Sequence, residues 1–121
     1  MPKILVIEDE LNIQKLAKAN LAASRYQVLV AADGEEGLGL AQWEHLNLIL
    51  LDLSLPGMSG WDVLMTLKAD RKLQKIPVII MTAMVPQSEE YKFASMRTAG
   101  YLIKPFSIDE LLRQVKQILG E

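Results

Sequence analysis

The sequence lacks cysteine altogether, and it lacks any excess of positive charge. Without cysteine, disulfide bonds and thiolate metal sites are excluded. Thirteen basic and fifteen acidic side chains give a formal net charge of −2, whereas proteins that bind nucleic acid usually carry a basic patch or stripe. The first apolar run, Ile4–Ile7, ends at Glu8 and is too short for the apolar region of a signal peptide or for a membrane span. Neither a signal peptide nor a membrane span is predicted, and we expect a cytoplasmic protein that binds neither nucleic acid nor membrane.

What is present is the composition of an ordinary globular protein: half of the 121 residues are hydrophobic and 23% are charged. A chain of this length suits one domain with a real core. No linker, internal repeat or low-complexity tract divides it. We therefore predict a single domain over residues 1–121.

Short apolar runs alternate with amphipathic segments along the chain. The runs predicted to form strands are Lys3–Ile7, Tyr26–Ala31, Leu46–Leu51, Ile76–Met81 and Tyr101–Ile103. Helices are predicted over Leu11–Ala23, from Asp33 through Trp43, from Ser59 to the basic segment Lys68–Lys72, over Pro86–Met96, and from Ser107 to Gly120. Trp43 and Trp61 are interpreted as core or half-buried anchors. Five strands alternating with five helices predict a parallel sheet covered on both faces.

The run Leu46–Leu51 is apolar except at Asn47, and it stops at a single carboxylate, Asp52. Turn-forming residues follow at once, at Pro56, Gly57 and Gly60. This pattern is typical of a strand buried on both faces. A charge at the end of such a strand is costly unless it has partners or a task.

Polar residues end the other predicted strands as well, and parallel strands bring their carboxyl ends to one edge of the sheet. These residues are Glu8, Asp9, Asp52, Thr82 and Lys104. Three carboxylates packed together repel one another unless they are protonated or neutralised, and Mg²⁺ prefers such oxygen ligands. A lysine and a hydroxyl beside them suit a phosphoryl group. The central carboxylate, Asp52, is then the expected nucleophile, which would form an acyl phosphate.

Four motifs in order resemble the receiver domain of two-component response regulators, of the single-domain, chemotaxis-regulator-like kind: ILVIEDE, LILLDLSLPGMSG, VIIMTA and YLIKPF. The resemblance covers essentially the whole chain. It implies an α/β, flavodoxin-like (βα)5 fold, which is a doubly wound parallel five-stranded sheet in the order 2-1-3-4-5. It also implies a phosphoacceptor module of a phosphorelay and not a turnover enzyme.

The resemblance assigns roles to the clustered residues. Asp52 would accept a phosphoryl group from a histidine kinase or a phosphotransfer protein. Mg²⁺ would be held by Glu8, Asp9 and Asp52, with the backbone carbonyl of Ser54 as a further ligand. Lys104 would contact the phosphoryl group, and its peptide bond to the following proline would be cis.

Two further residues would transmit the signal, according to the same resemblance. Thr82 would move toward the phosphoryl group and Tyr101 would swing inward behind it. These movements would change the surface formed by the fourth helix, fifth strand and fifth helix. That surface would then bind a downstream target, an attached output domain or a second copy of the phosphorylated chain.

Some positions depart from the family pattern or extend it. In this family, the position of Met84 flanks the path of the water that hydrolyses the acyl phosphate. Because a methionine side chain cannot orient a water, slow self-dephosphorylation is predicted. Arg97 stands where glycine often ends the fourth helix. Near the acceptor, Ile13, Pro105 and Phe106 are candidates for contact with the kinase.

Two other functions are compatible with parts of this pattern. An aspartate-nucleophile phosphohydrolase shares the fold type, but it usually carries a second Asp where this chain has Ser54. A receiver-like interaction module that phosphate does not regulate should have lost Asp52 or Lys104, and the chain keeps both.

Overall fold

The computed structural model describes residues 1–83 and 98–121. The predicted helix Pro86–Met96 and the predictions that concern Met84 and Arg97 therefore fall outside the described residues. The strands are β1 (Lys3–Ile7), β2 (Gln27–Ala31), β3 (Leu48–Asp52), β4 (Val78–Thr82) and β5 (Gly100–Ile103). The described helices are α1 (Leu11–Ala23), α2 (Gly34–Trp43), α3 (Gly60–Ala69) and α5 (Ile108–Leu119).

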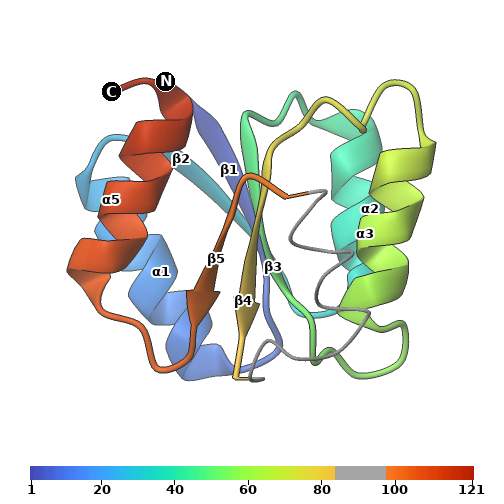
Figure 1. Cartoon of the computed structure of the whole chain (residues 1–121), viewed down its shortest axis with the longest axis horizontal. Helices are drawn as coiled ribbons and strands as arrows, with labels where there is room; N and C mark the ends of the chain where they lie inside the picture. Colours follow the sequence, from blue (N-terminus) through green and yellow to red (C-terminus); the bar gives the residue numbers. More distant parts are fainter. Residues whose placement is uncertain (84–97) are drawn as a thin grey trace.

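The five strands form one parallel sheet in the order β2-β1-β3-β4-β5. Figure 1 shows α1 and α5 against one face of this sheet and α2 and α3 against the other. The predicted doubly wound fold and its strand order are therefore confirmed. The peptide bond between Lys104 and Pro105 is cis, as predicted. None of the helices in the described ranges is long and apolar enough to cross a membrane.

Each face of the sheet has its own core, because successive side chains of a strand point to opposite faces. In β1, Leu5 and Ile7 join the cluster under α2 and α3. Ile4 and Val6 join the cluster under α1 and α5. All five residues of β3 are buried, as its apolar sequence predicts for the central strand of a sheet covered on both sides.

Three of the four described helices begin where capping residues predict. The side chains of Asp33, Ser59 and Ser107 accept hydrogen bonds from the amide three residues on, which starts α2, α3 and α5 respectively. The last helix ends at Gly120, whose φ of 76° is left-handed. These boundaries depend on local chemistry, and local sequence was enough to predict them.

The two central strands end later than the apolar runs predict. Asp52 and Thr82 are the last residues of β3 and β4 and do not follow them. The amides of Leu53 and Lys104 donate to the carbonyls of Met81 and Thr82, respectively. Since these bonds extend the ladder past the apolar runs, both polar side chains stand on rigid strand backbone.

The interpretation of Trp43 as an anchor is wrong, because its side chain is 87% exposed. The buried residues of α2 are Gly34, Gly37 and Ala41. Trp43 lies two residues past Ala41, about 200° around the helix at 3.6 residues per turn, and so points away from the sheet. Trp61 is half-buried and packs against the core, as predicted.

Candidate functional site

Three polar side chains are buried at the carboxyl edge of the sheet. Glu8 follows β1, Asp52 ends β3 and Thr82 ends β4, and their exposed fractions are 0%, 2% and 0%. Asp9 lies beside them and is exposed. Burying polar groups costs free energy unless they are paired. The burial of these three side chains therefore distinguishes this edge from an ordinary solvent-exposed surface.

The Lys104 ammonium lies among the carboxylates. Its Nζ donates a hydrogen bond to Asp52 Oδ2 at 3.1 Å and lies 2.6 Å from Glu8 Oε1. A third carboxylate, that of the exposed Glu10, is 4.0 Å away. One partly buried positive charge therefore serves two buried carboxylates, and the pocket has a deficit of cationic charge.

The pKa values in the pocket reflect this deficit. Burial raises the pKa of Glu8 to about 7, against the lowering effect of the Lys104 ammonium, and the neighbouring Asp52 adds to the rise. Burial alone would lower the pKa of Lys104, but its hydrogen bonds to Glu8 and Asp52 outweigh burial and raise it. The lysine therefore stays charged, while the Glu8 carboxyl group changes its protonation state near neutral pH.

The acceptor carboxylate is held in place by backbone. The amide of Ser54 donates to Asp52 Oδ1 at 2.9 Å. The next helix packs tightly against the same strand end, because Gly60 N donates to Leu53 O at 3.1 Å. A Cβ at Gly60 would overlap the Asp52 carbonyl oxygen and Leu53 Cα. Only glycine lets α3 start this close to the acceptor.

The three carboxylates fit a divalent cation. Glu8, Asp9 and Asp52 each offer an oxygen, and these oxygens all lie within 4.8 Å of one another. Glu8 Oε1 is buried, and its one partner among the described residues is the Lys104 ammonium, 2.6 Å away. Hard oxygen donors, an excess of negative charge and an exposed side that admits water suit Mg²⁺, which keeps several waters.

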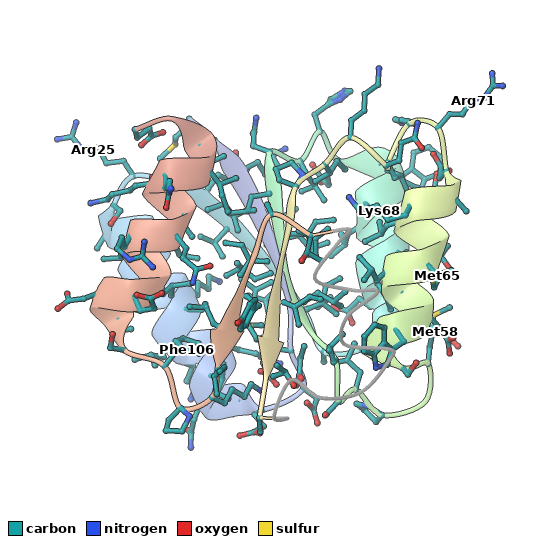
Figure 2. All side chains as sticks on the ribbon, viewed as in Figure 1. Arg25, Met58, Met65, Lys68, Arg71 and Phe106 are labelled. Atoms are coloured by element: carbon teal, nitrogen blue, oxygen red, sulfur yellow. The ribbon has the colours of Figure 1, made fainter. Side chains whose placement is uncertain are left out.

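A mostly apolar groove opens beside the pocket. It has a volume of about 390 Å³ and shares two charged residues, Glu10 and Lys104, with the site. Its apolar lining comes from Ile13, Leu16, Ala83, Pro105 and Phe106. Figure 2 shows Phe106 at the lower end of the molecule, on the loop that leads into α5. The groove brings together the three residues that the sequence suggested for kinase contact.

Tyr101 is not brought to the carboxylates. It lies on β5, where its partner on β4 is Ile80, two residues before Thr82. Its side chain is 40% exposed, and its carbonyl accepts a hydrogen bond from Gln114 Nε2 at 2.9 Å. A larger groove of about 730 Å³ runs between β5 and α5 and is lined in part by Tyr101, but by none of the three carboxylates.

Sequence reasoning missed two residues near the site. Glu10, at the start of α1, has no predicted role in the site, yet its amide donates to Glu8 Oε2 at 3.0 Å. Gln14 was not singled out, yet its Nε2 donates to the Glu8 carbonyl at 2.6 Å. No motif or spacing marks a glutamine one turn into a helix, so only the folded structure reveals this contact.

The comparisons with known proteins agree with this geometry. The family model for the response regulator receiver domain matches residues 4–116. The chain is 37% identical over 117 residues to the probable transcriptional regulator ycf27 of Cyanophora paradoxa, covering 97% of this chain and 48% of that protein. It is 36% identical over 119 residues to the polar-differentiation response regulator DivK of Brucella ovis, covering 98% and 96% respectively. It thus spans about half the length of the first relative and nearly all of the second.

Solved structures give the same result. The receiver domain of a sensor histidine kinase from Pseudomonas aeruginosa, with a magnesium ion coordinated in its active site cleft, has a TM-score of 0.89 at 28% identity, covering 99% of this chain and 98% of that one. The chemotaxis protein CheY4 of Vibrio cholerae has a TM-score of 0.87 at 28% identity, covering 98% of both chains. Fold, site geometry and sequence agree, and the chain belongs to the response regulator receiver domain family.

Proposed function

We propose that Asp52 is the phosphoacceptor of this receiver domain. The observation that carries the proposal is the position of its carboxylate: it is 2% exposed, ends the central strand, and is hydrogen-bonded to Lys104 Nζ at 3.1 Å. A carboxylate buried at such cost, on rigid backbone and beside a cation, suits nucleophilic attack on phosphorus.

The step is the transfer of a phosphoryl group from a phosphohistidine on a histidine kinase or phosphotransfer protein. An Asp52 carboxylate oxygen forms a bond to phosphorus while the phosphorus–nitrogen bond of the donor breaks. The nitrogen keeps the electron pair and takes up a proton. Lys104 holds the charged equatorial oxygens as a point charge, and the Thr82 hydroxyl donates to one of them.

Glu8, Asp9 and Asp52 would hold Mg²⁺, with the Ser54 carbonyl as a further ligand. When bound, the ion supplies the positive charge that the pocket needs to accept a second anionic group. The domain passes a signal and is not a turnover enzyme; it takes part only in its own phosphorylation and slow dephosphorylation. We expect it to act in the cytoplasm.

The signal would leave through β5 and α5. Thr82 would shift toward the phosphoryl group, and Tyr101, 40% exposed in this structure, would turn inward behind it. The groove of about 730 Å³ lined by Tyr101 would change shape with this movement. The partner that would take up the signal is a separate target protein, an output domain on the same chain, or a second copy of the phosphorylated chain.

The kinase or phosphotransfer protein would dock on the smaller groove. Its apolar lining and its position beside Lys104 suit a helix whose phosphohistidine is flanked by apolar side chains. Alanine at Ile13 and Phe106 should slow transfer from such a protein while leaving phosphorylation by acetyl phosphate unchanged. Equal slowing with both donors would place these residues in the chemistry and not in docking.

Intact mass measurement after incubation with acetyl phosphate and Mg²⁺ tests the acceptor. The wild type should gain the mass of one phosphoryl group, and Asp52→Asn should gain none. Asp62→Asn is the matched control, because Asp62 lies in the first turn of α3 and is exposed; this variant should be labelled like the wild type. Labelling of Asp52→Asn, or no labelling of the folded wild type, would refute the assignment.

A further inference from the structure

Glu8 is held at several points, although it lies beyond the last ladder pair of β1 and β3, Ile7 with Leu51. The Glu8 amide donates to the Ala31 carbonyl at 3.0 Å. The Glu8 carboxylate accepts from the Glu10 amide at 3.0 Å. The Glu8 carbonyl, which belongs to the peptide that joins Glu8 to Asp9, accepts a hydrogen bond from a side chain of α1.

That side chain is Gln14. Its Nε2 lies 2.6 Å from the Glu8 carbonyl oxygen, a short hydrogen bond for a neutral pair. The Gln14 amide also donates to the Glu10 carbonyl at 3.0 Å, in the first turn of α1. Gln14 thus bonds to the chain on both sides of Asp9 and links that loop to a rigid helix.

Asp9 depends on this link more than Glu8 does. Glu8 is fully buried and packed on all sides, whereas Asp9 is exposed. The direction of an exposed carboxylate is set mainly by its backbone, and the peptide plane just before Asp9 is the one that Gln14 holds.

We propose that Gln14 is a positioning residue that sets the divalent-cation affinity of the site; the inference rests on the proposed Mg²⁺ site. Mg²⁺ demands near-octahedral geometry with oxygens at about 2.0–2.1 Å. The three carboxylate oxygens lie within 4.8 Å of one another, so a rotation of the peptide before Asp9 would remove one ligand from reach. Loss of residues that orient metal ligands weakens binding by about 10–100-fold.

Isothermal titration calorimetry with Mg²⁺ tests this without any phosphorylation. Gln14→Met keeps the length of the side chain and removes the donor, and we expect its Kd for Mg²⁺ to rise about tenfold. Asn20→Leu is the matched control, because Asn20 Nδ2 makes the same kind of bond on the same helix, to the Leu16 carbonyl at 2.8 Å. The control should bind Mg²⁺ like the wild type.

A second readout separates positioning from general damage to the fold. With acetyl phosphate as donor, Gln14→Met should need about ten times more Mg²⁺ for half-maximal phosphorylation, yet reach the wild-type rate at saturating Mg²⁺. Gln14→Ala, a good helix former, provides the same test should the methionine variant fail to fold.

The outcomes are distinct. Wild-type Mg²⁺ affinity in a folded Gln14 variant would overturn the inference and leave the proposed site intact. An equal loss of affinity in Asn20→Leu would overturn it too, because the effect would then belong to the helix and not to the carbonyl contact. Failure of the wild type itself to bind Mg²⁺ would instead overturn the proposed metal site.

Discussion

The strands of the sheet begin at one end, the amino edge, and finish at the other, the carboxyl edge. Each of these two edges carries an ion pair of nearly the same length, but the two pairs differ in how far they are buried. At the amino edge, Lys3 Nζ lies 2.8 Å from Glu44 Oε2, and the two side chains are 22% and 34% exposed. At the carboxyl edge, Lys104 Nζ lies 2.6 Å from Glu8 Oε1, with exposures of 13% and 0%. Distance therefore does not distinguish a surface ion pair from a functional one.

Burial and the number of charges do distinguish them. Solvent screens the amino-edge pair, which is balanced one to one and contributes little. The carboxyl-edge lysine is shared with Asp52, in surroundings where desolvation costs several kcal/mol per ion. One edge is electrostatically complete, whereas the other has a negative charge left for a cation or a phosphoryl group to exploit.

Matched substitutions of Lys104 and Lys3 should show the largest difference in unfolding free energy between the two edges. Lys104→Met leaves two buried carboxylates without their cation and should cost about 3 kcal/mol of unfolding free energy in Mg²⁺-free buffer. Lys3→Met should cost less than about 1 kcal/mol. Urea titration measures both, and added Mg²⁺ should recover part of the first loss and none of the second. Equal costs would contradict the distinction between the two edges.

A buried acid at the amino edge offers a pH test. Burial, and then the hydrogen bond from its hydroxyl to Glu121 Oε2, raise the pKa of Tyr26 to about 12. The unfolded chain loses this proton near pH 10.0, so the folded state binds it more tightly. Stability is therefore full below pH 10 and is lost as the pH rises toward 12, by about 2 kcal/mol.

Denaturant titrations of the wild type and Tyr26→Phe between pH 8 and pH 12 measure this effect. The phenylalanine variant should start lower, by about 1 kcal/mol for the lost hydrogen bond, and then decline less steeply. Other groups, including Lys104, whose pKa is also raised, lower the stability of both proteins in this range. Parallel curves would show that Tyr26 does not titrate differently on folding.

Arg25 at the amino edge holds the left-handed backbone conformation, with a φ of 69°. It follows α1, and the amide of Tyr26 donates back to the Leu21 carbonyl, as in a helix-ending Schellman motif. Figure 2 shows its side chain extending away from the protein. Arg25→Gly should therefore raise the unfolding free energy by about 0.5–1 kcal/mol. A loss of stability in thermal unfolding would mean that the side chain makes a stabilising contact.

The smallest effect is expected at Trp43. Because this side chain is 87% exposed, Trp43→Ser should change stability by no more than about 0.5 kcal/mol. Trp61→Ser removes a ring packed on the core and should cost about 2 kcal/mol. Chemical denaturation of the two variants measures the difference. A large cost at Trp43 would show that the amino edge is less solvated than its exposure indicates.

Much of the fold could be predicted because its determinants are local. The side chains of Asp33 and Ser107 cap helices where they were expected to, since a cap needs only residues within one turn. The strand runs were predicted from hydrophobicity alone and were correct to within two residues. The ends of β3 and β4 were missed because neighbouring strands, and not the runs themselves, supply the last ladder bonds.

The residues that form the site could be predicted from the sequence, but the way in which their charges pair could not. Glu8, Asp52 and Lys104 were expected together because parallel strands share a carboxyl edge, and the distances confirm that they meet. That one ammonium serves both buried carboxylates depends on side-chain packing between elements more than forty residues apart. The contact from Gln14 to the Glu8 carbonyl joins residues only six positions apart, yet it has no sequence signal either, because it depends on how α1 lies against the end of β1.

The sequence by itself determined the order of the elements, the apolar strands and the polar residues that end them, because hydrophobic periodicity, capping and turn chemistry act over a few neighbouring residues. Only the tertiary structure decided which charges are buried. Lys3 begins a strand and Lys104 follows one, and each pairs with a glutamate, but no neighbouring residue shows how much of either pair is exposed to water. The fold leaves more of the Lys3–Glu44 pair than of the Lys104–Glu8 pair exposed to water, and this difference in solvation makes one edge a site and the other a surface.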